Sequence, residues 1–188
     1  MSFLLRRAMM ASGVITPSYA TWNPSDKAAN TTLSNGNLSA ATSSSNGGVR
    51  STVSKSSGKW YVEIKKTVPA DPMWAGVGTG TASLTTGVTT GFVSYRSDLG
   101  EIWNGAIDLG TYATMSSAAD VLGIALDATG KTVKFYVNNT LQATATYTFS
   151  NPVYILLVIG GTTTVITANF GATALTYAPP AGYSSGLF

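Results

Sequence analysis

A chain of 188 residues is long enough for one domain with a substantial core, and its 44% of hydrophobic residues can fill that core. Only 10% of the residues are charged, against roughly 25% in an ordinary soluble domain, and the net charge is +3. The absence of cysteine and histidine excludes disulfides, zinc sites built from those residues and every histidine-based catalytic triad.

The first twenty residues, "MSFLLRRAMMASGVITPSYA", are predicted to form an N-terminal arm. Ser12, Gly13 and Pro17 interrupt its apolar stretch, so we expect neither a signal peptide nor a membrane span. A Met-rich apolar segment suits adaptable contacts, which favours docking of the arm on a partner that holds it. The alternative is that the arm folds back over its own domain.

The side chains expected to dock are apolar, with two arginines that would pair with acidic groups of the partner. They are Phe3, Leu4, Leu5, Arg6, Arg7, Met9 and Met10.

Positive charge is concentrated in residues 1–66, which hold eight of the eleven lysines and arginines beside only Asp26 and Glu63. These lysines lie among serines and on predicted strands, and they do not form a basic cluster interleaved with aromatic residues, as binding of single-stranded nucleic acid requires. We therefore expect no nucleic-acid partner.

From Thr21 onward, apolar residues alternate with a period of two, which predicts strands. In "GKWYVEIKKT", Trp60, Val62 and Ile64 share one face, and Trp60 is assigned to the core. "KTVKFYVNN" and "LQATATYTF" alternate in the same way. "VYILLVIGG" is apolar throughout, as expected of a strand covered on both faces.

Turn signals separate these runs. "DATG" (127–130) fits a type I turn, and "NN" (138–139) fits the positive φ of a two-residue hairpin. About a dozen short strands and no helix beyond the arm predict an all-β fold, a two-sheet antiparallel β-sandwich over residues 21–188.

Acidic residues were assessed as possible catalytic pairs. Asp120 and Asp127 stand at opposite ends of one predicted strand, roughly 20 Å apart, which exceeds the roughly 5–9.5 Å of glycosidase carboxylates. Asp98 and Glu101 are closer, but they fit a hairpin turn in which Glu101 begins the next strand. Glu63 has no acidic neighbour on its strand face. We therefore predict no catalytic acid pair and no metal site.

Four segments, in this order along the chain, resemble the SPRY domain: "SSGKWYVEI" (56–64), "AGVGTG" (75–80), "DVLGIALDATGKTVKFYVNN" (120–139) and "ITANFG" (166–171). The opening "TWNPSDKAANTTLSNGNLSA" and the closing "YAPPAGYSSG" look like the versions found in bacteriophage and prophage proteins. The resemblance covers roughly residues 21–183. It implies a bent, concanavalin-like sandwich that acts as a protein-interaction or ligand-presenting module, with no catalytic residues and no cofactor.

The resemblance also implies that variable loops at one end of the sandwich build the ligand surface. The residues expected in or beside such loops are Arg50, Trp74, Tyr95, Arg96, Trp103 and Asn104. The aromatic residues among them could form a platform for sugar or peptide, or they could belong to the core. Arg96 is predicted to pair with Asp98 across a turn.

These observations predict a non-catalytic structural and binding protein of a phage virion. The arm would anchor it, in several copies, to other virion proteins of the capsid or tail, where it decorates the particle or contacts a host-surface glycan or protein. The alternative is a secreted or surface carbohydrate-binding, lectin-like module with its site on the aromatic loops. A carbohydrate-active enzyme ranks third because no suitable acid pair is found.

Overall fold

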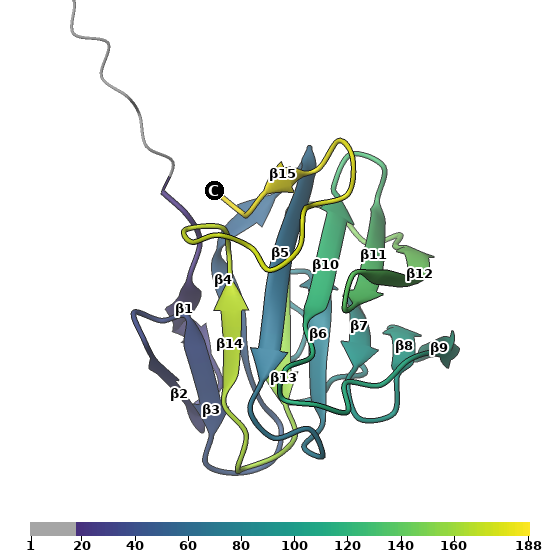
Figure 1. The fold of residues 1–188 in the computed structure, drawn as a ribbon. Coiled ribbons are helices and arrows are strands. Elements are labelled where there is room, and N and C mark those ends of the chain that lie inside the picture. The colour runs from purple at the N-terminus through teal and green to yellow at the C-terminus, as the bar shows by residue number, and fades with distance from the viewer. Residues whose placement is uncertain (1–17) are drawn as a thin grey trace, which may run out of the picture.

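The computed structural model describes residues 18–188, which form two antiparallel β-sheets packed face to face (Figure 1). Over this range there is no helix, and hence none that could cross a membrane. The predicted all-β sandwich is therefore confirmed. Residues 1–17 lie outside the described part of the chain, so the docking of Phe3, Leu4, Leu5, Arg6, Arg7, Met9 and Met10 stays a prediction.

The described residues contain fifteen strands. They are β1 (Trp22–Lys27), β2 (Thr31–Ser34), β3 (Ser39–Thr42), β4 (Gly47–Lys55), β5 (Lys59–Lys66), β6 (Met73–Gly78), β7 (Phe92–Arg96), β8 (Glu101–Asn104), β9 (Ile107–Thr111), β10 (Leu122–Asp127), β11 (Thr132–Val137), β12 (Thr140–Thr146), β13 (Val153–Ile159), β14 (Ile166–Asn169) and β15 (Ser184–Ser185).

Seven strands form sheet A in the order β1-β4-β13-β6-β7-β8-β9. Sheet B has the order β12-β11-β10-β5-β14-β3-β2, and β15 adds to β5 in parallel. Strands β1 and β2 therefore lie at one side of the sandwich, whereas β9 and β12 lie at the other (Figure 1).

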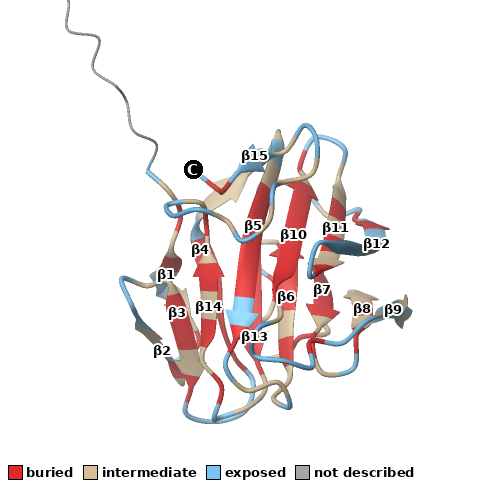
Figure 2. Ribbon diagram, viewed as in Figure 1, coloured by how far each residue is buried: buried red, intermediate tan, exposed pale blue. Residues whose placement is uncertain are grey.

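The core forms between the sheets from the alternating apolar residues. Val62 of β5 stands opposite Ile124 of β10, and Ile64 stands opposite Leu122, all with almost no exposed surface. The buried positions concentrate on the central strands (Figure 2). Trp60 lies only half-buried at the edge of this core, so its predicted core position is confirmed in part.

Strand β13 is buried on both faces, as its continuous apolar sequence predicts. Ile155 and Leu157 belong to the core between the sheets. Leu156 and Val158 point outward and pack with Phe92 in a second, smaller cluster. The connection 79–91 covers this outer cluster, so part of the outer face of sheet A is not open to solvent.

The predicted turns have the expected geometry. Asn138 and Asn139 have φ values of 50° and 65°, and the Gly130 N–H donates to Asp127 Oδ1 at 2.7 Å. Asp120 accepts hydrogen bonds from the Ser117 N–H and from the Asn138 amide. Both aspartates therefore stabilise turns, as predicted.

Part of the outer face of sheet B is also covered, by the C-terminal segment 171–187. Glu63 is 2% exposed and accepts hydrogen bonds from the N–H groups of Thr176 at 2.7 Å and Tyr177 at 2.8 Å. Leu187 enters the core, and its carbonyl accepts a hydrogen bond from the Ala20 N–H. The segment thus joins the two ends of the described chain.

Candidate binding surface

Three neighbouring strands of sheet A place the predicted aromatic and charged residues on one outer face. Trp74 of β6 stands opposite Arg96 of β7, which in turn stands opposite Glu101 of β8. Trp103 follows Glu101 by two residues and therefore shares its face. We call Trp74, Arg96, Glu101 and Trp103 the outer strip.

The outer strip is held together by polar contacts among its own side chains and with the neighbouring Asp98. Arg96 donates to both carboxylate oxygens of Asp98, at 2.9 and 3.0 Å, and to Glu101 Oε2 at 3.3 Å. The indole N–H of Trp103 donates to the same Glu101 oxygen at 3.2 Å. The bidentate hydrogen bonds with Asp98 raise the pKa of the Arg96 guanidinium. The predicted pairing of Arg96 with Asp98 is confirmed.

Asp98 and Glu101 form a hairpin, not an acid pair. Gly100 has a φ of 72° and donates its N–H to the Arg96 carbonyl, and β8 begins at Glu101, as predicted. Both carboxylates contact the same guanidinium, at 2.9 Å for Asp98 and 3.3 Å for Glu101.

Trp74 is partly covered by the 79–91 connection. Its ring lies against Gly87, where an added Cβ would come 1.9 Å from Trp74 Cγ, and its N–H is buried without a hydrogen-bond partner. The Arg96 guanidinium lies 5.1 Å from the ring centroid, within range of a cation–π contact. Trp103 and Arg96 are also half-buried, so each keeps part of its surface open to solvent.

The expectation that Arg50 lies at an exposed ligand-binding loop is wrong. Arg50 is part of β4 and is 3% exposed. Its guanidinium donates to the carbonyls of Thr79 and Ala82 and to Asp26 Oδ1. The side chain is buried because it fastens the connection 79–91 to sheet A.

The prediction that Tyr95 lies in or beside a ligand-binding loop is also wrong. It lies in β7 with no exposed surface, points into the core beside Phe135, and donates its hydroxyl hydrogen to the Ala113 carbonyl. Burial raises its pKa above the ordinary range of tyrosine. Alternation along β7 explains the difference, because Tyr95 and Arg96 must point to opposite faces.

Asn104 lies apart from the strip, at the end of β8. Its amide donates to the Thr146 carbonyl at 3.0 Å and so links sheet A to the end of β12 in sheet B. It lines a groove of about 390 Å³ together with Ile107 and Phe149. Trp74, Arg96, Trp103 and Asn104 are likewise strand residues instead of loop residues.

Sequence reasoning missed the apolar residues around this groove. Ile107 is 64% exposed, and it follows an Asn-Gly pair in which Gly105 has a φ of 62°. Asn-Gly flanked by apolar residues is a strong hairpin signal. Applied to Asn104 and Gly105, this rule would have predicted the β8–β9 hairpin. Two alternating apolar residues, Ile107 and Leu109, then mark β9.

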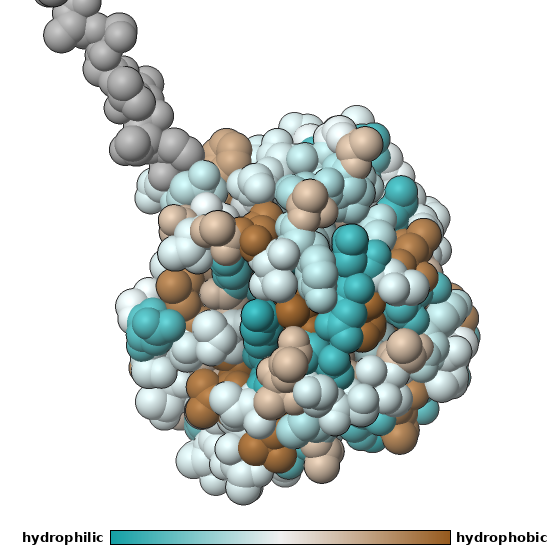
Figure 3. Space-filling view, in the orientation of Figure 1, coloured by the Kyte–Doolittle hydropathy of each residue, from teal (hydrophilic) through white to brown (hydrophobic). Residues whose placement is uncertain are grey.

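The remaining surface gives fewer functional indications. On the face that sheet B presents, apolar patches are small and scattered among polar residues (Figure 3). A groove of about 400 Å³ lies there, lined by Glu63, Lys65 and Asn169 among others. Within residues 18–188, no cluster of three or more acidic side chains could hold a metal ion.

A two-sheet sandwich with a self-paired aromatic and charged strip on its outer face has the form of an interaction module. The chain belongs to the SPRY domain family, since the family model of the SPRY domain matches residues 58–173. SPRY domains are protein-interaction modules and are generally non-catalytic. None of the curated proteins matches the chain in sequence.

Solved structures of SPRY domains have the same fold. The SPRY domain of human HERC1 is similar with a TM-score of 0.68 at 15% identity, and the match covers 78% of this chain and 96% of that one. The PSpry domain of TRIM65 gives 0.65 at 15% identity, covering 81% and 92%. Stonustoxin gives 0.66 at 21% identity, covering 81% of this chain but 27% of the toxin chain.

Proposed function

We propose that this chain is a non-catalytic structural and binding protein of a phage virion. Its arm, residues 1–20, anchors it to a capsid or tail protein, and its outer strip binds a protein partner. The phage-like opening and closing segments, the few charged residues and the apolar, arginine-bearing sequence of the arm support the virion assignment.

The observation that carries the binding proposal is the half-buried pair of Arg96 and Trp103 on the outer face of sheet A. Arginine and tryptophan are enriched among the residues that dominate protein interfaces. Arg96 is already oriented by Asp98 and Glu101, so little side-chain entropy is lost when a partner covers it.

The test is co-sedimentation with particles that lack this protein. We expect the full chain to bind saturably and the variant lacking residues 1–17 to lose binding, because the sandwich itself stays complete without them. Trp103→Ala should remove partner binding by the strip, whereas Tyr136→Ala is the matched control, a half-buried aromatic residue on sheet B. Equal binding of the full and truncated chains would contradict the anchoring role of the arm.

A glycan array run with the same variants addresses the carbohydrate alternative. Saturable glycan binding that is lost in Trp103→Ala, together with no particle binding by the full chain, would replace the virion proposal with a carbohydrate-binding module. Particle binding without glycan binding would support the proposal as stated.

A further inference from the structure

Strand β9 is an exposed edge of sheet A with an unusual surface for an edge strand. Ile107 is 64% exposed and Leu109 is 38% exposed, and in the described part of the chain β9 pairs only with β8. Apolar edge strands are liable to pair with another chain. The opposite edge strand, β1, carries Pro24 and Lys27 and pairs irregularly with β4, which protects it.

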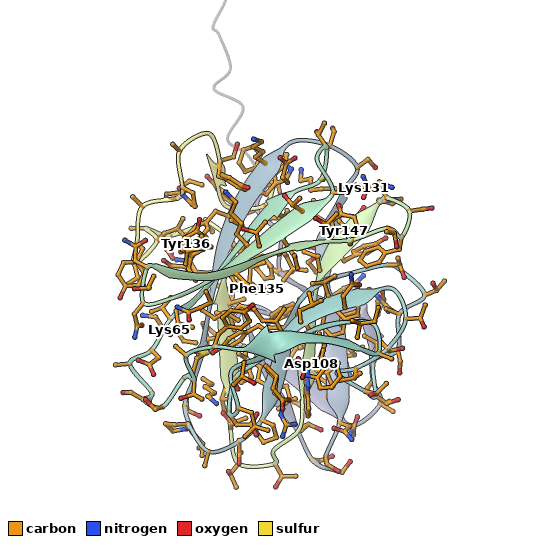
Figure 4. The ribbon with its side chains drawn as sticks, turned by 90° about the vertical axis from the view of Figure 1, so that its right-hand side faces the viewer. Lys65, Asp108, Lys131, Phe135, Tyr136 and Tyr147 are labelled. Atoms are coloured by element: carbon orange, nitrogen blue, oxygen red, sulfur yellow. The ribbon has the colours of Figure 1, made fainter. Side chains whose placement is uncertain are left out.

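The β9 edge also carries a negative charge. Asp108 is exposed between the two apolar residues, and β9 itself contains no lysine or arginine. Figure 4 looks onto this side of the molecule and shows Asp108 on the near strand. The edge therefore suits an extended segment that is apolar and positively charged.

Residues 3–10 of this chain, "FLLRRAMM", have that composition, with Arg6 and Arg7 between apolar residues. We propose that this segment of one copy adds as a strand to the β9 edge of a neighbouring copy, which rests on the proposed role of the arm as an anchor. Ile107 and Leu109 would contact its apolar side chains, and Asp108 would pair with one of its arginines.

The reach of the arm favours a neighbouring copy over the same chain. Eight Cα–Cα steps separate Ser18 from Met10 and span at most about 29 Å. Six inter-strand spacings separate β1 from β9, which is about 29 Å measured along the sheet. Met10 therefore reaches the β9 edge of its own sandwich only if the chain between Met10 and Ser18 is fully extended, whereas the β9 edge of a neighbouring copy sets no such limit.

The arrangement would be head-to-tail. Ser18 leaves the sandwich near β1, whereas β9 lies at the opposite side (Figure 1). Each copy therefore offers one arm and one free edge on different surfaces, and repetition of this contact produces a ring or a filament.

The first experiment measures the mass of the purified full chain by sedimentation velocity over a wide concentration range. We expect species of at least twice the 19.4 kDa monomer. The double variant Ile107→Lys/Leu109→Lys should weaken association at least about tenfold, since it places like charges against Arg6 and Arg7 and removes apolar contacts. Leu141→Lys is the matched control, an exposed leucine on the edge strand β12 of the other sheet.

A mixing experiment distinguishes association between copies from binding within one chain. The Ile107→Lys/Leu109→Lys chain keeps its arm, and the chain lacking residues 1–17 keeps its β9 edge. Each should be monomeric alone, and together they should form a 1:1 dimer that grows no further. Asp108→Asn isolates the charge, because it retains the oxygen that accepts the Gly110 N–H at 2.8 Å, and it should weaken association less than the double variant.

Three results would overturn the proposal: a full chain that stays monomeric, a double variant that associates like the wild type, or a mixture that forms no dimer. Arm-dependent binding to particles by a chain that stays monomeric would leave the proposed function standing while this inference fails. Self-association without any binding to particles would support this inference and contradict the proposed anchoring of the chain to a virion.

Discussion

Replacing Arg50 with alanine should destabilise the sandwich without directly touching a ligand. The guanidinium is almost fully buried and donates to two carbonyl groups of the 79–91 connection and to Asp26. Each bond to a charged group contributes about 1.5–3 kcal/mol, but the two carbonyls can regain water if the connection lifts. Asp26 is 35% exposed, so its ion pair contributes about 1 kcal/mol or less.

Together these contacts give an expected loss of about 3–5 kcal/mol in the free energy of unfolding, the range for breaking a buried charged pair. Urea denaturation followed by tryptophan fluorescence measures this loss, and hydrogen exchange of residues 79–91 shows whether the connection is released. Asp26→Asn retains an acceptor and should cost under about 1 kcal/mol. Arg50→Lys retains the charge but not the fork of donors, so its cost should be intermediate.

The reasoning would be refuted if Arg50→Ala changed stability by less than about 1 kcal/mol with unaltered exchange in the connection. Loss of partner binding by an Arg50→Ala chain of unchanged stability would contradict the purely structural role assigned to Arg50.

Three further measurements test other parts of the structure. Burial raises the pKa of five tyrosines, among them Tyr61, Tyr95 and Tyr147, that of Tyr147 to about 12, so the folded state retains their protons above pH 10 while the unfolded state loses them. Stability should therefore fall as pH rises above 10, and absorbance at 295 nm should show delayed ionisation of Tyr61, Tyr95 and Tyr147. Glu63→Ala removes the acceptor of two part-buried N–H groups and should cost about 1–3 kcal/mol, with faster exchange of those amides. Gly87→Ala would clash with Trp74 and should cost about 1–3 kcal/mol in urea denaturation.

The fold was predictable because its determinants are local. A period of two assigns Val62 and Ile64 to one face whatever the rest of the chain does, and Asn138 and Asn139 set the hairpin between β11 and β12. The pairing of Arg96 with Asp98 was equally accessible, because the two residues are only two positions apart.

The candidate site was less predictable because burial depends on segments distant in sequence. The Arg50 side chain is buried by contacts with residues 24 to 32 positions away. Glu63 has the alternation of a solvent-facing residue, but it is buried by amides 113 and 114 positions further along the chain. Single-sequence patterns describe which face a side chain takes, and they do not describe what later covers that face.

The two covering segments also explain where recognition can occur. The connection 79–91 covers one part of the outer face of sheet A, and the segment 171–187 covers the outer face of β5. The β8–β9 side of sheet A is left with Trp103, the Asn104 groove and the β9 edge. Trp103 and Asp108 are cross-strand partners, so the outer strip and the β9 edge adjoin. A partner on the strip and an arm on the edge would therefore be close enough to affect each other, and Trp103→Ala should be measured for self-association as well as for partner binding.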